Sequence, residues 1–377
     1  MSLFNTIVTF FGFTVGLSTA GYFSVSFFKN NFKTFKIDLT SILIITLTGS
    51  LILCTLILAL GGWVVDLLKL NQKLLLISLY LSLSSIIFSL WLDYFRVRER
   101  VLIYGLLSCG FALLNFLLTL LFIVYCETGW LGFVYSQTIC NSLIAILSLI
   151  YFFHKHLLIK PNKWAQIKKV IMWGLPLVPH AASTWIKQGI DRYIIDFYYS
   201  MSDVGLFSFA LNLANIIVMV GVAFNQTNSV SIYKILSNKD GDHHSIIRKL
   251  HHKESLFVVS YIVITLFVIL LVSVLVPMFI GKYIPSIKLF YILSIFGLSF
   301  CCYLVYCNYL FYFNKTVKLM KITFGLAIIH LILSLILTKY SLIYTCIIYL
   351  LLQTTVSVLV YIESRKLLKK YEYEEDL

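Results

Sequence analysis

Charge and polar sequence are scarce in this chain. Only 12% of its 377 residues are Asp, Glu, Lys or Arg, 60% are hydrophobic, and the mean hydropathy is +0.93. The longest polar stretches, 155–169 and 234–254, are too short to bury a core, which excludes a separate soluble domain. A Walker lysine motif, a Gly-rich phosphate loop and a long loop on the outer side are also lacking.

Long apolar runs take the place of polar sequence. A helix that crosses a bilayer needs about 20 mostly apolar residues. Eleven runs reach this length: 2–27, 39–65, 73–94, 101–126, 130–153, 171–197, 203–232, 255–280, 286–312, 317–338 and 341–362. The sequence therefore predicts an all-α polytopic membrane protein.

The basic residues occupy every second gap between these runs. Lys and Arg concentrate in the gaps at 29–36, 96–100, 155–169, 234–253, 315–321 and 365–370. Cytoplasmic loops retain such residues during insertion, so we expect a cytoplasmic C-terminus and Met1 on the outer face. The formal net charge of +14 is then mostly a topology signal, and a nucleic-acid partner has little support.

Two pairs of helices that are six apart resemble each other. Residues 24–29 recur as 229–234, and Gly110, Asn115 and Thr119 correspond to Gly325, His330 and Ser334. An even separation preserves orientation, which predicts two parallel bundles. Their expected bounds are 1–154 for an N-terminal lobe of five helices, 155–170 for a basic cytoplasmic linker, 171–366 for a C-terminal lobe of six, and 367–377 for a cytoplasmic tail.

Four short motifs carry a family resemblance. GLPLVPH at 174–180, DRY at 191–193, VGLFS at 204–208 and FNQ at 224–226 resemble the polysaccharide and O-antigen flippases of the multidrug/oligosaccharidyl-lipid/polysaccharide (MOP) exporter superfamily. The resemblance implies a MATE-like arrangement of two six-helix lobes around a central cavity. The five-plus-six pattern here would then lack the first helix.

The same resemblance implies a function. O-antigen members of this family translocate undecaprenyl-diphosphate-linked oligosaccharide across the bacterial inner membrane, for O-antigen, lipopolysaccharide or capsule synthesis. We therefore expect an inner-membrane transporter that is not an enzyme and needs no cofactor or metal. Its expected partners are the lipid-linked oligosaccharide, the bilayer and, in an assembly complex, a polysaccharide polymerase and a chain-length regulator.

The helix expected at 171–197 contains ionisable residues, which are costly at membrane depth and indicate a function. Lys187, Asp191 and Arg192 are candidates for binding the substrate's diphosphate, with Asp191 holding a cation in place. Lys187 and Asp191 lie four apart on one face, so they could instead neutralise each other. Arg192 could extend to the outer surface.

Other polar residues of the C-terminal half are weaker candidates. Pro176 and Pro179 could form a hinge, or be ordinary membrane-helix prolines. His180 and His330 could couple transport to protons, or be neutral and hydrogen-bonded. Amides must find partners in a bilayer, in a wet cavity or on a neighbouring helix. The amide candidates for the substrate site are Asn212, Asn225 and Gln226.

Two other function classes are alternatives to the flippase prediction. A membrane polymerase or polyprenol-dependent glycosyltransferase would carry a sizeable external loop or paired acidic residues near the outer surface. A multidrug or other exporter of the same superfamily would need a carboxylate deep in the first lobe, whereas Asp38, Asp66, Asp93 and Glu127 all fall at helix ends. An anionic substrate is therefore favoured.

Overall fold

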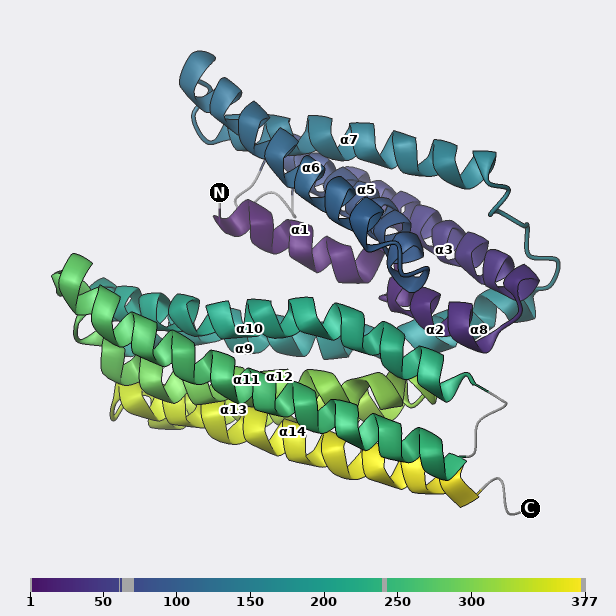
Figure 1. Ribbon diagram of the computed structural model, residues 1–377. Helices are drawn as coiled ribbons and strands as arrows, with labels where there is room; N and C mark the ends of the chain where they lie inside the picture. The colour runs from purple at the N-terminus through teal and green to yellow at the C-terminus, as the bar shows by residue number, and fades with distance from the viewer. Residues whose placement is uncertain (1, 61, 63–70, 239–242, 374–377) are drawn as a thin grey trace. The chain divides into compact units, whose positions relative to one another are not determined.

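The computed structural model describes residues 2–60, 62, 71–238 and 243–373 (Figure 1). Every regular element in these ranges is a helix. Contacts divide the chain into an N-terminal unit, Met1–Val178, and a C-terminal unit, Pro179–Leu377. The expected all-α fold class is confirmed.

The N-terminal unit begins with a broken span. Helices α1 (Ser2–Val15) and α2 (Tyr22–Lys29) meet at a 58° bend, with the short turn η1 (Thr19–Gly21) between them. Leu17 and Ser18 there have positive φ angles of 47° and 52°, which an α-helix cannot continue through. The unit continues with α3 (Phe32–Ala59), α5 (Gln72–Val97), α6 (Val101–Leu120), the π-helical turn η2 (Leu121–Tyr125), α7 (Leu131–His154) and α8 (Trp164–Gly174).

The C-terminal unit holds most of α9 (Leu177–Tyr198) and five further long helices. These are α10 (Met201–Leu236), α11 (His243–Phe279), α12 (Ser286–Tyr312), α13 (Thr316–Leu337) and α14 (Leu342–Tyr373), with the turn η3 (Gly281–Tyr283) between α11 and α12. Ser200 and Asp203 form a capping box that starts α10. Phe207, Phe296 and Tyr349 lie in the buried core shared by α10, α12 and α14.

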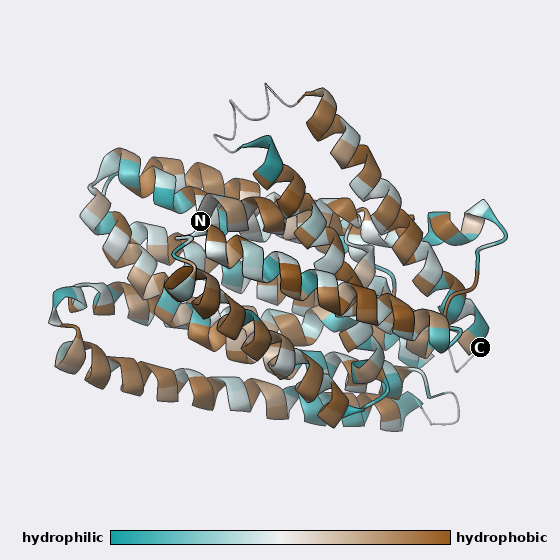
Figure 2. Cartoon of the chain, turned by 90° about the horizontal axis from the view of Figure 1, so that it is seen from above, coloured by the Kyte–Doolittle hydropathy of each residue, from teal (hydrophilic) through white to brown (hydrophobic). Residues whose placement is uncertain are grey.

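The long helices suit a bilayer. Nine helices of the described residues are long and apolar enough to cross a membrane, and the bent α1–α2 pair would make ten. Helix α9, which carries the charged residues of interest, lies outside this set. Figure 2 shows apolar residues along the helices and polar ones concentrated at helix ends and connections. The chain is a multi-pass membrane protein.

The unit boundary differs from the expected one. Helix α8 falls partly within the expected linker of 155–170, yet it belongs to the N-terminal unit. Its Trp173 packs on Tyr22 with ring centroids 5.3 Å apart, and a Cβ on Gly174 would lie 2.5 Å from the Leu17 carbonyl oxygen. The division consequently falls at Val178/Pro179. At the other end, α14 continues to Tyr373, into the segment expected to be a tail.

Candidate functional site

Helix α9 begins at a proline-rich turn. Pro176 lies in the turn between α8 and α9, and Pro179 is in the first turn of α9, where a missing N–H costs no helical hydrogen bond. The two units divide beside Pro179. These positions suit a hinge, and the hinge itself stays a prediction.

Lys187 lies midway along α9 and is half-buried. Its ammonium donates a hydrogen bond to Oε1 of Gln353 on α14, at 3.1 Å. Tyr349, one turn earlier on α14, donates its hydroxyl to the backbone carbonyl of Lys187. None of the ion pairs found between described residues includes Lys187.

A pocket with a volume of about 10 Å³, room for about one water molecule, lies beside this lysine. Its other lining residues come from α9, α12 and α14, and they are Thr184, Phe296, Phe300, Tyr349 and Gln353. Phe296 and Phe300 lie four apart on α12, as do Tyr349 and Gln353 on α14, so each pair shares one helix face. The pocket therefore combines one cation with an amide, two hydroxyls and three aromatic rings.

Asp191 pairs with a histidine rather than with a neighbouring cation. Its Oδ2 lies 2.8 Å from Nε2 of His330 on α13, and both side chains are only 1% exposed. Asp191 Oδ1 and His330 Nδ1 are buried without a hydrogen-bond partner in the described part of the chain. The alternative in which Asp191 neutralises Lys187 is therefore not what the structure shows.

Arg192 and His180 lie in contrasting surroundings. Arg192 is exposed, and it forms no ion pair with Asp196 or any other described carboxylate. His180 is held from both sides of its ring, because Nδ1 lies 2.8 Å from the Thr323 hydroxyl and Nε2 lies 3.3 Å from the Tyr303 hydroxyl. Proton coupling by His180 or His330 stays a prediction.

The amides of α10 do not form one cluster. Asn225 accepts a hydrogen bond from Nδ2 of Asn308 on α12 at 2.8 Å, so it links two helices. Asn212 is exposed and Gln226 is half-buried. None of the three lines the Lys187 pocket. Their assignment to substrate binding stays a prediction, and for Asn225 the contact favours helix packing.

Sequence reasoning missed the partners of these residues. Gln353, Tyr349, Tyr303 and Thr323 are uncharged residues within the apolar runs, so no charge of their own marks them. A signal existed in the four-residue spacing of Tyr349 and Gln353, which places two polar groups on one face of α14.

Comparisons with known proteins agree with this architecture. No protein-family model matches the chain. The Vibrio cholerae MATE transporter VcmN in its bent form superposes with a TM-score of 0.73 at 12% identity, covering 98% of this chain and 87% of that one. An outward-facing multidrug resistance MATE family transporter of the MOP superfamily gives 0.74 at 12% identity, covering 97% and 86%. The chain thus has the MATE transporter fold.

One protein is related to this chain in sequence. It is the Lsg locus putative protein 1 of Haemophilus influenzae, which is 25% identical over 330 residues, covering 84% of this chain and 76% of that protein. Its name specifies a locus and no activity.

Proposed function

We propose that this protein is a flippase that moves an anionic, lipid-linked oligosaccharide from the cytoplasmic to the outer face of the inner membrane by alternating access. The substrate would be an undecaprenyl-diphosphate-linked repeat unit of O-antigen or capsule. The observation that carries the proposal is Lys187, a half-buried cation in the middle of α9 that has an amide partner and no carboxylate partner among the described residues.

A cation in the middle of a membrane helix needs an opposite charge or hydrogen-bond acceptors nearby. A charged side chain within a membrane is costly, and such residues normally pair with an opposite charge. The carboxylate one turn away, Asp191, is bonded to His330. Lys187 has three N–H donors, and Gln353 accepts from one of them. A diphosphate supplies both the missing negative charge and acceptor oxygens for the remaining donors.

One aromatic ring beside Lys187 suits the rest of the substrate's head. Phe300 is half-buried and lines the Lys187 pocket, whereas Phe296 and Tyr349 are packed in the core. The face of Phe300 can stack on a sugar ring once the pocket opens beyond its present volume of about 10 Å³. The apolar polyprenyl tail can stay in the lipid throughout translocation, so the protein needs to shelter only the polar head.

The buried carboxylates give less support to a multidrug exporter, which would bind organic cations. Among the described residues, each buried carboxylate already has a cationic or hydrogen-bonding partner: Asp38 with Ser26, Asn30 and Lys169, Asp191 with His330, and Glu254 with Arg365. The half-buried Asp93 pairs with Arg96, and Asp66 lies outside the described residues. An organic cation would have to displace these partners. A free anion would find Lys187 without such competition.

One further observation supports the polysaccharide assignment. The motifs between 174 and 226 that resemble the polysaccharide flippases include the start of α9 and two short segments of α10, 204–208 and 224–226. A polymerase and a chain-length regulator would then receive the translocated repeat unit. Proton coupling through His330 is a second part of the proposal, since its Nε2 lies 2.8 Å from Asp191 Oδ2 in a buried contact.

The test uses cells that lack this gene and carry it on a plasmid. Lys187→Ala should abolish the surface polysaccharide ladder and leave undecaprenyl-linked repeat units on the cytoplasmic face of the inner membrane. Lys187→Arg, which keeps the charge, should restore part of the ladder. The matched control is Lys288→Ala, an exposed lysine near the start of α12, and it should export normally.

The measurements are a polysaccharide gel, quantification of repeat units on each face, and the amount of membrane-inserted protein. An unchanged ladder with Lys187→Ala would remove this lysine from the mechanism. Repeat units that accumulate on the outer face would indicate a polymerase-like step instead.

A further inference from the structure

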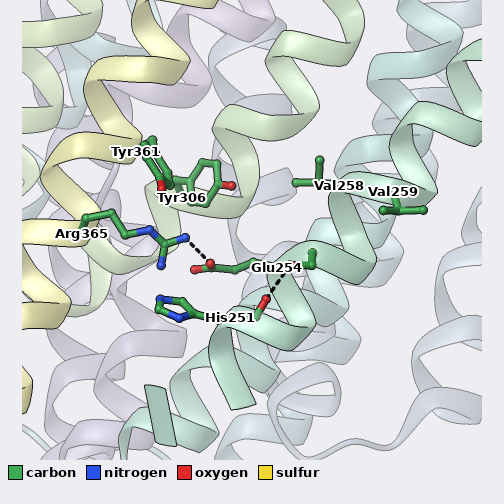
Figure 3. Close-up of a pocket in the computed structure, with 8 residues that line it drawn as sticks. His251, Glu254, Val258, Val259, Tyr306, Tyr361 and Arg365 are labelled. Carbon is green, nitrogen blue, oxygen red and sulfur yellow. Dashed lines mark hydrogen bonds and ion pairs between the residues drawn. The ribbon is translucent and has the colours of Figure 1, made fainter. Parts of the chain in front are cut away.

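Two buried carboxylates of the C-terminal unit have partners of different chemistry. Glu254 pairs with Arg365 beside the pocket shown in Figure 3, and a guanidinium keeps its charge at any pH that a cell reaches. Asp191 pairs with His330, and imidazole is the side chain whose charge ordinarily changes between about pH 5 and about pH 8. Of these two pairs, Asp191–His330 is therefore the one that protons can switch.

The geometry of the Asp191–His330 contact indicates where a further proton binds. Asp191 Oδ2 is an acceptor, so His330 Nε2, which lies 2.8 Å from it, carries a hydrogen. The other ring nitrogen, His330 Nδ1, is buried and has no hydrogen-bond partner in the described part of the chain. A proton taken up by the pair therefore goes to Nδ1. The pair is neutral with this proton, and it carries the negative charge of Asp191 without it.

Tyr349 of α14 contacts both this pair and the backbone of Lys187. Its ring centroid lies 4.8 Å from that of His330, with the two planes at 87°. Its hydroxyl donates to the backbone carbonyl of Lys187, and it also interacts electrostatically with the Asp191 carboxylate. A tyrosine hydroxyl has one hydrogen to donate. The Lys187 carbonyl and the Asp191 carboxylate therefore compete for the same donor.

The other charged or titratable side chains near Tyr349 and the pair come from α9 and α14. They are Lys187, Arg192 and Cys346. Toward α10 and α12, the Tyr349 ring packs on Phe207 and Phe296, with centroids 6.1 and 5.1 Å away. A change in the charge of the pair therefore acts on α9 and α14, the helices that carry Lys187 and its amide partner.

We propose that Tyr349 is a positioning residue that links the charge of the Asp191–His330 pair to diphosphate binding at Lys187, an inference that rests on the proposed function. When His330 holds the further proton, Asp191 is compensated and the Tyr349 hydroxyl holds the Lys187 carbonyl. When His330 loses it, the uncompensated carboxylate is the stronger acceptor, because hydrogen bonds to charged groups are stronger. The hydroxyl then turns to Asp191 and releases the turn of α9 that carries Lys187. Diphosphate binding is consequently tighter at low pH.

The test measures the affinity of undecaprenyl diphosphate for the full purified chain in phosphatidylcholine nanodiscs, at about pH 5 and about pH 8. The ratio of the two dissociation constants includes the titration of the ligand and of Lys187. His330→Gln keeps an N–H for Asp191 but cannot gain a proton, so its ratio gives this background. The ratio of the unmodified chain should exceed the background by roughly tenfold, a factor typical of coupling between two sites.

The decisive variant is Tyr349→Phe, which removes the hydroxyl and keeps the ring. It should lose more than half of this factor, because only the through-space effect of the charge then remains. A tyrosine that merely packs in the core would instead weaken binding equally at both pH values. The matched control is Tyr344→Phe, which removes the hydroxyl of an exposed tyrosine on the same helix and should keep the full factor.

This inference and the proposed function fail in different ways. Equal affinity of Lys187→Ala and the unmodified chain would place the diphosphate elsewhere and would remove the proposed function. Thermal unfolding without ligand then tests Tyr349 alone, because Tyr349→Phe should shift the unfolding temperature by different amounts in the unmodified and His330→Gln chains. Equal shifts would overturn the inference. So would equal affinity ratios of the unmodified and His330→Gln chains, or an unchanged ratio in Tyr349→Phe.

Discussion

The two units treat their buried charges differently. In the N-terminal unit, Asp38 accepts hydrogen bonds from Ser26 at 2.6 Å and Asn30 at 3.0 Å near helix ends, and it lies 4.0 Å from the half-exposed Lys169 of α8. Asp93 pairs with Arg96 one turn away. In the C-terminal unit, Asp191 pairs with His330 of another helix, and Lys187 bonds to Gln353 of a third.

The two groups of charged residues have different explanations: those at helix ends follow from the topology, whereas those in the middle of α9 indicate a function. Charges at helix ends can reach water or headgroups, as the half-exposed Lys169 beside Asp38 can. Charges buried in the middle of a helix, as on α9, cannot, so they persist only where the fold or a ligand provides partners. The C-terminal unit is consequently the place to look for the substrate.

The largest expected effect is on the buried pair of the C-terminal unit. Asp191→Ala should destabilise the protein by about 3 kcal/mol, because it leaves His330 buried without its hydrogen-bond partner. Thermal unfolding of the purified protein would measure this loss. Asp196→Ala, an exposed carboxylate on the same helix, is the control and should change little. A similarly small effect for both would mean that the Asp191–His330 contact contributes no stability.

A glycine contact of the N-terminal unit should give the next largest effect. A Cβ at Gly49 of α3 would lie 2.1 Å from the Val15 carbonyl oxygen of α1. Gly49→Ala should therefore force two helix backbones apart, at about 1–3 kcal/mol. Gly110→Ala meets nothing within 4 Å and serves as the control. Equal unfolding temperatures for these two variants would contradict the close helix approach.

The smallest expected effect concerns the amide pair between α10 and α12. A double-mutant cycle of Asn225→Ala and Asn308→Ala should give a coupling of about 0.6 kcal/mol, which is typical of interhelical hydrogen bonds in membranes. Normal export by Asn225→Ala would assign this residue to packing. Lost export with unchanged stability would return it to the substrate site and would extend the functional region along α10.

Much of the fold could be predicted from the sequence. The run expected at 286–312 coincides with α12, and that at 317–338 differs from α13 by one residue at each end. Such agreement arises because span length and basic loops are dictated by the bilayer, whatever the packing. Prediction was weaker where protein contacts decide the boundary, as at α8, which packs through Trp173 onto the N-terminal unit.

The sequence by itself determined the all-α fold class, the approximate spans and the presence of costly ionisable residues on α9, because hydrophobicity and charge act locally on each segment. Only the tertiary structure decided which of those residues are paired. Spacing on one helix placed Asp191 beside Lys187, but the packing of α13 brings His330 to Asp191 from 139 residues away. The Asp191–His330 contact leaves Lys187 without a carboxylate partner among the described residues. This pairing depends on how the helices pack, which no single segment of the sequence encodes.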